Sequence, residues 1–169
     1  MLTMTKKNKL LDEIEQYLTM ASSENREILE TLFRNIKEKH NGKHRSYLSA
    51  LMQVKGTVLE NGNYEIRIPI QPLIHNPLGM VHGGIIASVI DISMGSIVHR
   101  SIPDGYATVT TELKINYLKP GLGKELICVA SILHKGNSLC VCEARVYNDE
   151  ESLVAIGTGS FFVLKPRTS

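Results

Sequence analysis

Residues 82–99, HGGIIASVIDISMGSIVH, open on two glycines and continue as an apolar run of helical length with one charged side chain, Asp91. A segment that is apolar nearly all round predicts a helix buried in the core. The run over residues 84–98 is too short to span a bilayer, and it contains Asp91 and three serines. We therefore expect a core helix and no membrane partner.

The isolated carboxylate of Asp91 requires an explanation. A buried carboxylate is disfavoured as an anion, so it must find donors, take up a proton, or lie where water and a substrate reach it. The third case describes a catalytic base or nucleophile. The alternative is a hydrogen bond to a neighbouring backbone group at a surface edge, as for most aspartates.

The composition favours a folded domain of ordinary size and argues against a nucleic-acid partner. The chain has 169 residues, of which 43% are hydrophobic, enough to bury a core. Its net charge of +2 comes from 19 basic and 17 acidic residues spread along the chain. No block of like charge is long enough to follow a phosphate backbone, so no nucleic acid is expected.

The cysteines and the start of the chain predict a cytoplasmic protein with reduced thiols. The chain has an odd number of cysteines, namely Cys128, Cys140 and Cys142. Its first residues, MLTMTKKNKLLDEIEQ, lack the apolar region of an export signal. Two cysteines in one strand are too few for a zinc site. His40 and His44 are separated by a helix-breaking Asn-Gly pair. We expect no metal.

The chain divides into an N-terminal helical extension, residues 1–45, and a β-rich domain, residues 46–169. Apolar residues repeat at helical spacing around residues 10–18 and again around 28–36. Ser22 or Ser23 can cap the second helix, and Asn41-Gly42 is expected to end it. The two helices could pack on the outer face of the sheet, extend the oligomer or partially cover the site, and we expect packing.

Short β-rich segments surround the central helix. Tight turns separate most of them, which favours antiparallel neighbours. About six antiparallel strands wrapped around one apolar helix give an α+β architecture. The expected strands cover residues 48–58, 64–70, 106–118, 124–134, 138–147 and 153–164.

The loop before the central helix, residues 71–81, is the long irregular segment of the β-rich domain. Pro72, Pro77 and Gly79 interrupt regular structure there, and His75 and Asn76 lie among them. Functional groups concentrate in such loops, so we expect some of them here.

Three segments carry a resemblance to a known family: HNPLGMVHGGIIASVIDISMG at residues 75–95, TTELKINYLKP at 110–120 and HKGNS at 134–138. Together they resemble the hotdog-fold acyl-CoA thioesterases of the PaaI-like branch, which are related to 4-hydroxybenzoyl-CoA thioesterases. The resemblance covers residues 47–164. It implies a hotdog fold and hydrolysis of acyl-CoA thioesters to free acid and coenzyme A. Coenzyme A is then part of the substrate, and no cofactor is required.

The resemblance also assigns catalytic roles. It makes the Gly83 backbone N–H the donor to the developing oxyanion, with Asn76 beside it, and Asp91 the nucleophile or general base. Thr110 matches a Ser/Thr that orients the attacking water or the carboxylate. These residue types suit the chemistry, because a helix N-terminus offers unpaired N–H groups and a favourable dipole. Gly83 and Gly84 lack side chains, so a carbonyl can approach.

Further residues are candidates for substrate binding. His82 could cap a neighbour, orient the loop asparagine or transfer a proton. By resemblance, the turn at 134–138 contributes to binding of coenzyme A: Gly136 admits a phosphate to the backbone and Lys135 neutralises its charge. Asn137 stands where many relatives carry Arg or Lys. The alternative for this segment is an ordinary hairpin turn.

Helix geometry separates the two halves of the candidate site. Eight residues place Gly83 and Asp91 about 12 Å apart along the axis, too far for one helix to serve one carbonyl. We therefore expect an obligate homodimer, with Asn76 and Gly83 from one subunit and Asp91 and Thr110 from the other. By resemblance, two dimers can pair into a homotetramer.

Two other functions compete with hydrolysis. A noncatalytic acyl-CoA sensor or scaffold on the same fold would not need Asp91. A hydratase on a related fold would need an Asp and His dyad in a different motif, which the sequence does not contain.

Overall fold

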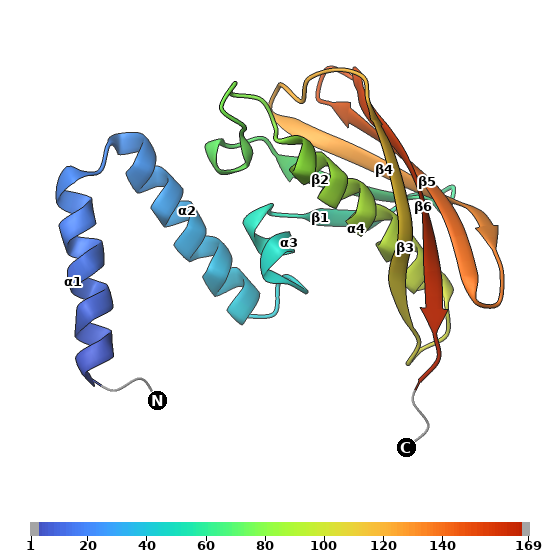
Figure 1. The fold of residues 1–169 in the computed structure, drawn as a ribbon, viewed down its shortest axis with the longest axis horizontal. Coiled ribbons are helices and arrows are strands. Elements are labelled where there is room, and N and C mark those ends of the chain that lie inside the picture. The colour runs from blue at the N-terminus through green and yellow to red at the C-terminus, as the bar shows by residue number, and fades with distance from the viewer. Residues whose placement is uncertain (1–3, 167–169) are drawn as a thin grey trace. The chain divides into compact units, whose positions relative to one another are not determined.

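The computed structural model describes residues 4–166 and divides the chain into two compact units, Met1–Leu51 and Met52–Ser169. The first unit contains the helices α1 (Met4–Met20), α2 (Ser23–His40) and α3 (Tyr47–Leu51) (Figure 1). Ser22 caps α2, its hydroxyl accepting from the Asn25 N–H, and Asn41 is the C-cap. The two predicted N-terminal helices, the break between them and the end of the second are thus confirmed.

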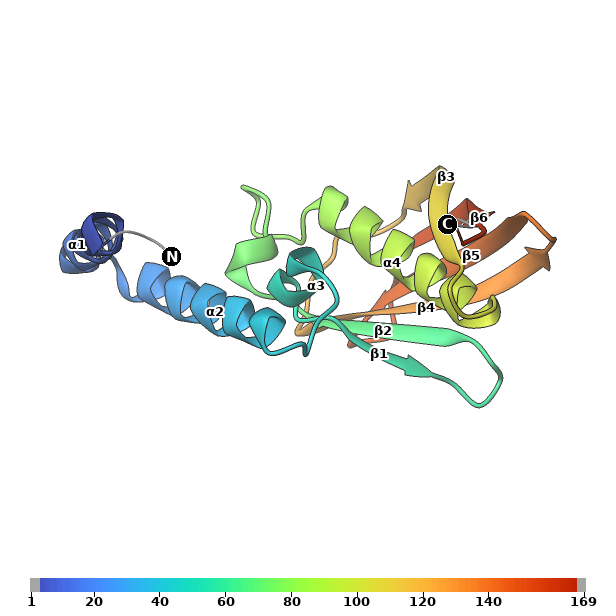
Figure 2. The same cartoon turned by 90° about the horizontal axis from the view of Figure 1, so that it is seen from below.

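The second unit is one six-stranded antiparallel sheet with a long helix, α4 (Gly83–Ser101), against one face (Figure 2). The strand order is β1-β2-β4-β5-β6-β3, so β1 and β3 are the edges. A short 3-10 helix, Pro72–Ile74, lies in the loop before α4. The strands are β1 (Lys55–Val58), β2 (Tyr64–Pro69), β3 (Ala107–Tyr117), β4 (Glu125–Lys135), β5 (Leu139–Asn148) and β6 (Leu153–Leu164).

The α+β hotdog architecture is therefore confirmed, and five of the six predicted strands lie where the pattern indicated. The first does not: residues 48–58 were expected to form one strand, but 47–51 are helical and the strand begins at Lys55. Ser46 Oγ accepts from the Ser49 N–H and so caps the start of α3. Gln53 has a φ of 52°, in the left-handed region, and so separates the end of α3 from the start of β1.

The core lies between α4 and the sheet. Val89, Ile90, Met94 and Val98 of α4 are fully buried, and β2, β4, β5 and β6 supply the facing side chains. The sequence predicts that α4 is buried on all sides. On the side that faces away from the core, however, Asp91 and its neighbours are only half-buried. In the single chain, α4 thus keeps one side accessible, and Asp91 lies on it.

Candidate active site

A β-bulge determines which side chains of β3 face α4. Thr110 pairs with Phe161 of β6 and Glu112 with Ser160, so Thr111 is an extra residue in β3. In a regular strand, Thr110 and Leu113 would point to opposite faces, because side chains alternate. The extra residue puts both on the α4 side. The site therefore depends on this irregularity of the edge strand.

Asp91 and Thr110 form a hydrogen-bonded pair. The Thr110 hydroxyl donates to Asp91 Oδ1 at 2.7 Å. Asp91 is half-buried and Thr110 exposed, so the carboxylate has a donor and also remains open to water. The structure thus brings together two of the predicted residues, and the pair fits a base or nucleophile held in one orientation.

The N-terminus of α4 leaves one backbone donor available. His82 Nδ1 accepts from the Gly84 N–H at 2.9 Å, and the N–H groups of Ile85 and Ile86 donate to the His82 carbonyl. Among the hydrogen bonds of the described residues, only the Gly83 N–H of this first turn lacks an acceptor. It lies at the positive end of the helix dipole, where an oxyanion is stabilised.

His82 therefore acts in the structure as the N-cap of α4. Its Nδ1 is an acceptor, so a neutral ring carries its proton on Nε2. The sequence predicts Gly84 as a substrate-binding residue beside the oxyanion donor Gly83, but the Gly84 N–H is already bonded to His82. The two glycines thus differ in what they can offer a substrate.

Asn76 shapes the loop that precedes α4. Its side-chain oxygen accepts from the N–H groups of Leu78 and Met80, at 2.9 and 3.3 Å. The loop is joined to α4 through the His82 N–H, which donates to the Ile74 carbonyl at 2.9 Å. Asn76 thus holds the polypeptide just before the helix, and no described hydrogen bond connects its side chain to Gly83 or Asp91.

Tyr117 is a site residue to which the sequence alone assigned no role, although it lies within the NYLKP segment. Its hydroxyl donates to the Gly83 carbonyl at 2.9 Å, and a Cβ added at Gly83 would lie 3.5 Å from its ring. Tyr117 lies on the same side of β3 as Thr110, because the bulge is followed by regular alternation. The edge strand thus bonds α4 twice, at its first turn and at Asp91.

The predicted nucleotide-binding turn lies at the other end of α4. Lys135 Nζ donates to the carbonyl of Ser101, the last residue of α4, where a cation suits the helix dipole. The Gly136 N–H donates to the Leu139 carbonyl at 2.9 Å, and Asn137 is exposed. Within one chain, this turn is a helix length away from Gly83, and both interpretations of it stay predictions.

The catalytic candidates of one chain thus form two separate groups. Asn76, Gly83 and Tyr117 belong to the start of α4, and Asp91 and Thr110 to its middle. Gly83 and Asp91 belong to one continuous helix, and the eight-residue separation between them corresponds to about 12 Å along its axis.

The cysteines do not offer an alternative nucleophile. All three are buried and free of disulfides. Burial raises the pKa of the Cys128 and Cys142 thiols to about 12, so these groups stay protonated near neutral pH. Among residues 4–166, no group of three or more His, Cys, Asp or Glu side chains could hold a metal ion. No helix described is long and apolar enough to cross a membrane.

Comparison with known proteins identifies the family of the chain. Residues 78–155 match the family model described as the thioesterase superfamily. The chain is 33% identical over 116 residues to a Saccharolobus solfataricus protein named as an esterase, SSO2140, covering 69% of this chain and 82% of that one. It is 28% identical over 97 residues to the medium/long-chain acyl-CoA thioesterase YigI of Escherichia coli, covering 50% of this chain and 63% of YigI.

A solved structure extends the likeness. The crystal structure of the BH2602 protein of Bacillus halodurans, determined with CoA, superposes with a TM-score of 0.85 at 44% identity. The match covers 91% of this chain and 99% of that one, a share larger than the second unit alone. It therefore reaches into the N-terminal helices.

The fold and the relatives define a thioester hydrolase of the hotdog fold. The chain belongs to the thioesterase superfamily, and within it to the PaaI-like type.

Proposed function

We propose that the protein hydrolyses acyl-CoA thioesters to the free acid and coenzyme A at a site shared by two copies of the chain. The Thr110–Asp91 hydrogen bond carries the proposal, because it places an oriented, accessible carboxylate on the helix whose first turn offers a free N–H. The substrate class is supported by the acyl-CoA thioesterase name of YigI and by the CoA in the BH2602 structure.

The residues divide the chemistry between them. Asp91 either attacks the thioester carbonyl or takes a proton from the attacking water, while Thr110 holds its carboxylate. The Gly83 N–H donates to the carbonyl oxygen as it becomes negative. The carbon–sulfur bond then breaks, the sulfur takes up a proton, and coenzyme A leaves as the thiol. Water supplies the oxygen of the new acid.

Distance is the argument for two copies. A reacting carbonyl lies about 3 Å from its oxyanion donor and about 3 to 3.5 Å from the attacking atom, yet Gly83 and Asp91 of one helix are about 12 Å apart. A second α4 running in the opposite direction brings its Gly83 beside Asp91 of the first. Among the described strands, the edge strand β3 pairs with β6 alone, so its other edge offers unpaired backbone groups for such a partner.

Thiol release from a panel of acyl-CoA esters tests the reaction. We expect Asp91→Asn to lower kcat/KM at least about a hundredfold, because the base or nucleophile is lost. Asp104→Asn is the matched control, since Asp104 is an exposed aspartate in the loop after α4, and it should keep full activity. A wild-type protein that releases no thiol from any ester, or an Asp91→Asn variant with full activity, contradicts the proposal.

Mixed dimers test the shared site. Asp91→Asn retains the Gly83 N–H, and Gly83→Pro, which removes that N–H, retains Asp91. In a shared site, co-expression of these two inactive variants with different tags restores one complete site per mixed dimer, about a quarter of wild-type activity overall. If each site belonged to one chain, the mixture would stay inactive. A light-scattering mass of one chain for the active protein would also contradict a shared site.

A further inference from the structure

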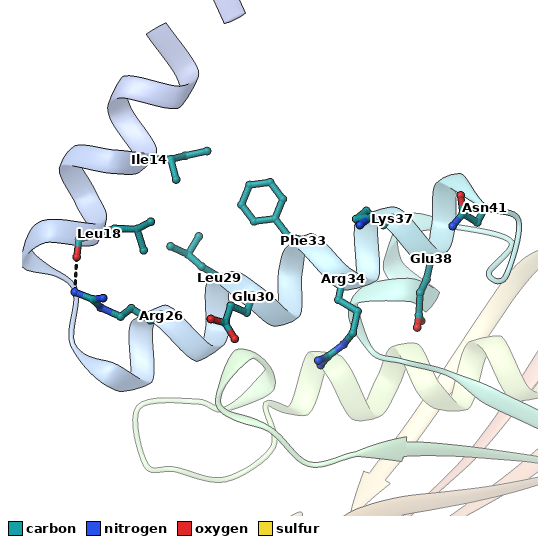
Figure 3. A pocket seen from close by; sticks show the side chains of 10 residues that line it. All are labelled: Ile14, Leu18, Arg26, Leu29, Glu30, Phe33, Arg34, Lys37, Glu38 and Asn41. Carbon is teal, nitrogen blue, oxygen red and sulfur yellow. Dashed lines mark hydrogen bonds between the residues drawn. The ribbon is translucent and has the colours of Figure 1, made fainter. Parts of the chain in front are cut away.

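The helices α1 and α2 of the first unit diverge around an open groove of about 670 Å³ (Figure 3). Arg26 holds the connection between them, donating from Nη2 to the Leu18 carbonyl at 2.6 Å and from Nε to the Ala21 carbonyl at 3.3 Å. The hairpin is thus fixed near its turn, while the apolar sides of the two helices remain apart along the groove.

Apolar side chains of this hairpin are exposed within the first unit. Phe33, which projects into the groove, is 48% exposed, and Ile36, one turn further along, is 46% exposed. On α1, Ile14 and Leu18 line the groove, and Leu11 is 49% exposed. Short helices with an open apolar stripe gain little stability alone and are stabilised when a partner covers the stripe.

Charges along the groove indicate which partner fits. Arg26, Glu30, Arg34 and Glu38 line it at intervals of four residues with alternating signs along α2, and Lys37 lines it as well (Figure 3). When these four positions are read in the opposite direction along the helix, each positive charge falls where a negative one stood, and the reverse. A second α2 placed antiparallel and centred near Leu32 therefore puts Arg26 opposite Glu38 and Glu30 opposite Arg34, whereas a parallel copy in register puts like charges together.

The outer charges already have partners within the chain, because Glu38 pairs with Lys43 and His44 and Arg26 donates to the carbonyls of the α1–α2 connection. The central charges are available for pairing with a second copy. Glu30 and Arg34 are exposed and form no ion pair with each other or with other described residues. Arg34 makes one described side-chain hydrogen bond, from Nη2 to Thr31 Oγ1 at 3.2 Å.

We propose that the α1–α2 hairpin binds the α1–α2 hairpin of a second copy of this chain, with the two α2 helices antiparallel and Phe33 of each copy near the two-fold axis. Burial of the groove side chains drives the association, and the alternating charges set its direction. The proposal does not rest on the catalytic site, since all its residues belong to the first unit.

Cross-linking of the full chain tests the arrangement. In Phe33→Cys, the two introduced thiols lie within reach of a bismaleimide that spans about 10 Å, the separation of packed helix axes. In Asn25→Cys, the matched control, the thiols of antiparallel copies lie about 20 Å apart along the axis. The native cysteines are buried and should not react. We expect cross-linked dimer from Phe33→Cys and very little from Asn25→Cys.

Charge reversal then tests the partner. In the Phe33→Cys background, Glu30→Arg or Arg34→Glu alone places like charges together twice per pair and should lower cross-linking about tenfold. The Glu30→Arg/Arg34→Glu double variant restores opposite charges. An equal mixture of the two single variants restores them too, because one helix is then basic and the other acidic.

Three results would overturn the proposal: equal cross-linking of the two cysteine variants, no effect of the single reversals, or no recovery in the mixture. Absence of any cross-linked dimer from Phe33→Cys would overturn it as well. Circular dichroism of each variant checks that the exposed substitutions leave the helices intact.

Discussion

Replacing Gly83 by proline tests whether its backbone N–H is the oxyanion donor, while leaving the helix in place. Gly83 is the first residue of α4, and its N–H has no acceptor among the described residues, so proline there removes no helical hydrogen bond. The preceding residue, His82, has φ −60° and ψ 135°, the extended conformation that a residue before proline adopts. A Cβ at position 83 would meet its nearest neighbour, Tyr117, at an ordinary 3.5 Å.

The expected magnitude follows from the loss of one donor. Removing a single oxyanion-hole hydrogen bond costs about 10²- to 10³-fold in kcat. Gly83→Ala is the control, because it adds the same Cβ but keeps the N–H. The ratio of the two variants therefore isolates the hydrogen bond from any crowding by the added carbon. Proline should leave Tm unchanged or slightly raised, since it restricts the unfolded chain.

The assay is thiol release from acyl-CoA with kcat and KM determined separately, together with thermal unfolding. We expect Gly83→Pro to fall at least about a hundredfold below Gly83→Ala in kcat. If the two variants differed by less than about threefold while both stay folded, the Gly83 N–H would not be the oxyanion donor.

Three further predictions concern other contacts. Thr110→Val removes the donor to the Asp91 carboxylate and should lower kcat/KM about 10- to 100-fold, while Thr110→Ser should keep most activity; equal loss in both would contradict the hydrogen-bonding role. Tyr117→Phe frees the first turn of α4 and should lower kcat several-fold with KM little changed, and an unchanged kcat would exclude a positioning role. Because burial raises the pKa of Cys128 and Cys142 to about 12 from an ordinary 9.0, the unfolded chain loses these protons first. The free energy of unfolding should therefore fall as pH rises from about 9 to 12, less steeply in Cys128→Ala, as denaturant titrations can show.

The local pattern of the sequence was sufficient for most of the fold. The Asn-Gly pair ends α2, Ser22 begins it, and five strands lie where alternation and turns placed them, because these features depend on neighbouring residues. The segment 47–51 is the exception. Its helix begins at the Ser46 cap, and Gln53, which has a positive φ, follows shortly after its end; apolar periodicity reveals neither feature.

The candidate site was predicted in part. The apolar helix with its lone Asp91, the two glycines before it and the following strand pointed to a hotdog thioesterase. The distance between Gly83 and Asp91 also follows from the sequence alone, because the rise of an α-helix is fixed and both residues belong to one local segment.

Only the tertiary structure decided which groups meet. Thr110 reaches Asp91 because a bulge in β3 turns it towards α4, and Tyr117 reaches the Gly83 carbonyl by the same register. The sequence by itself determined the helix, its charge and the class of chemistry, since these rest on residues close along the chain. Contacts between an edge strand and a helix depend on strand register over long separations, which no local period specifies.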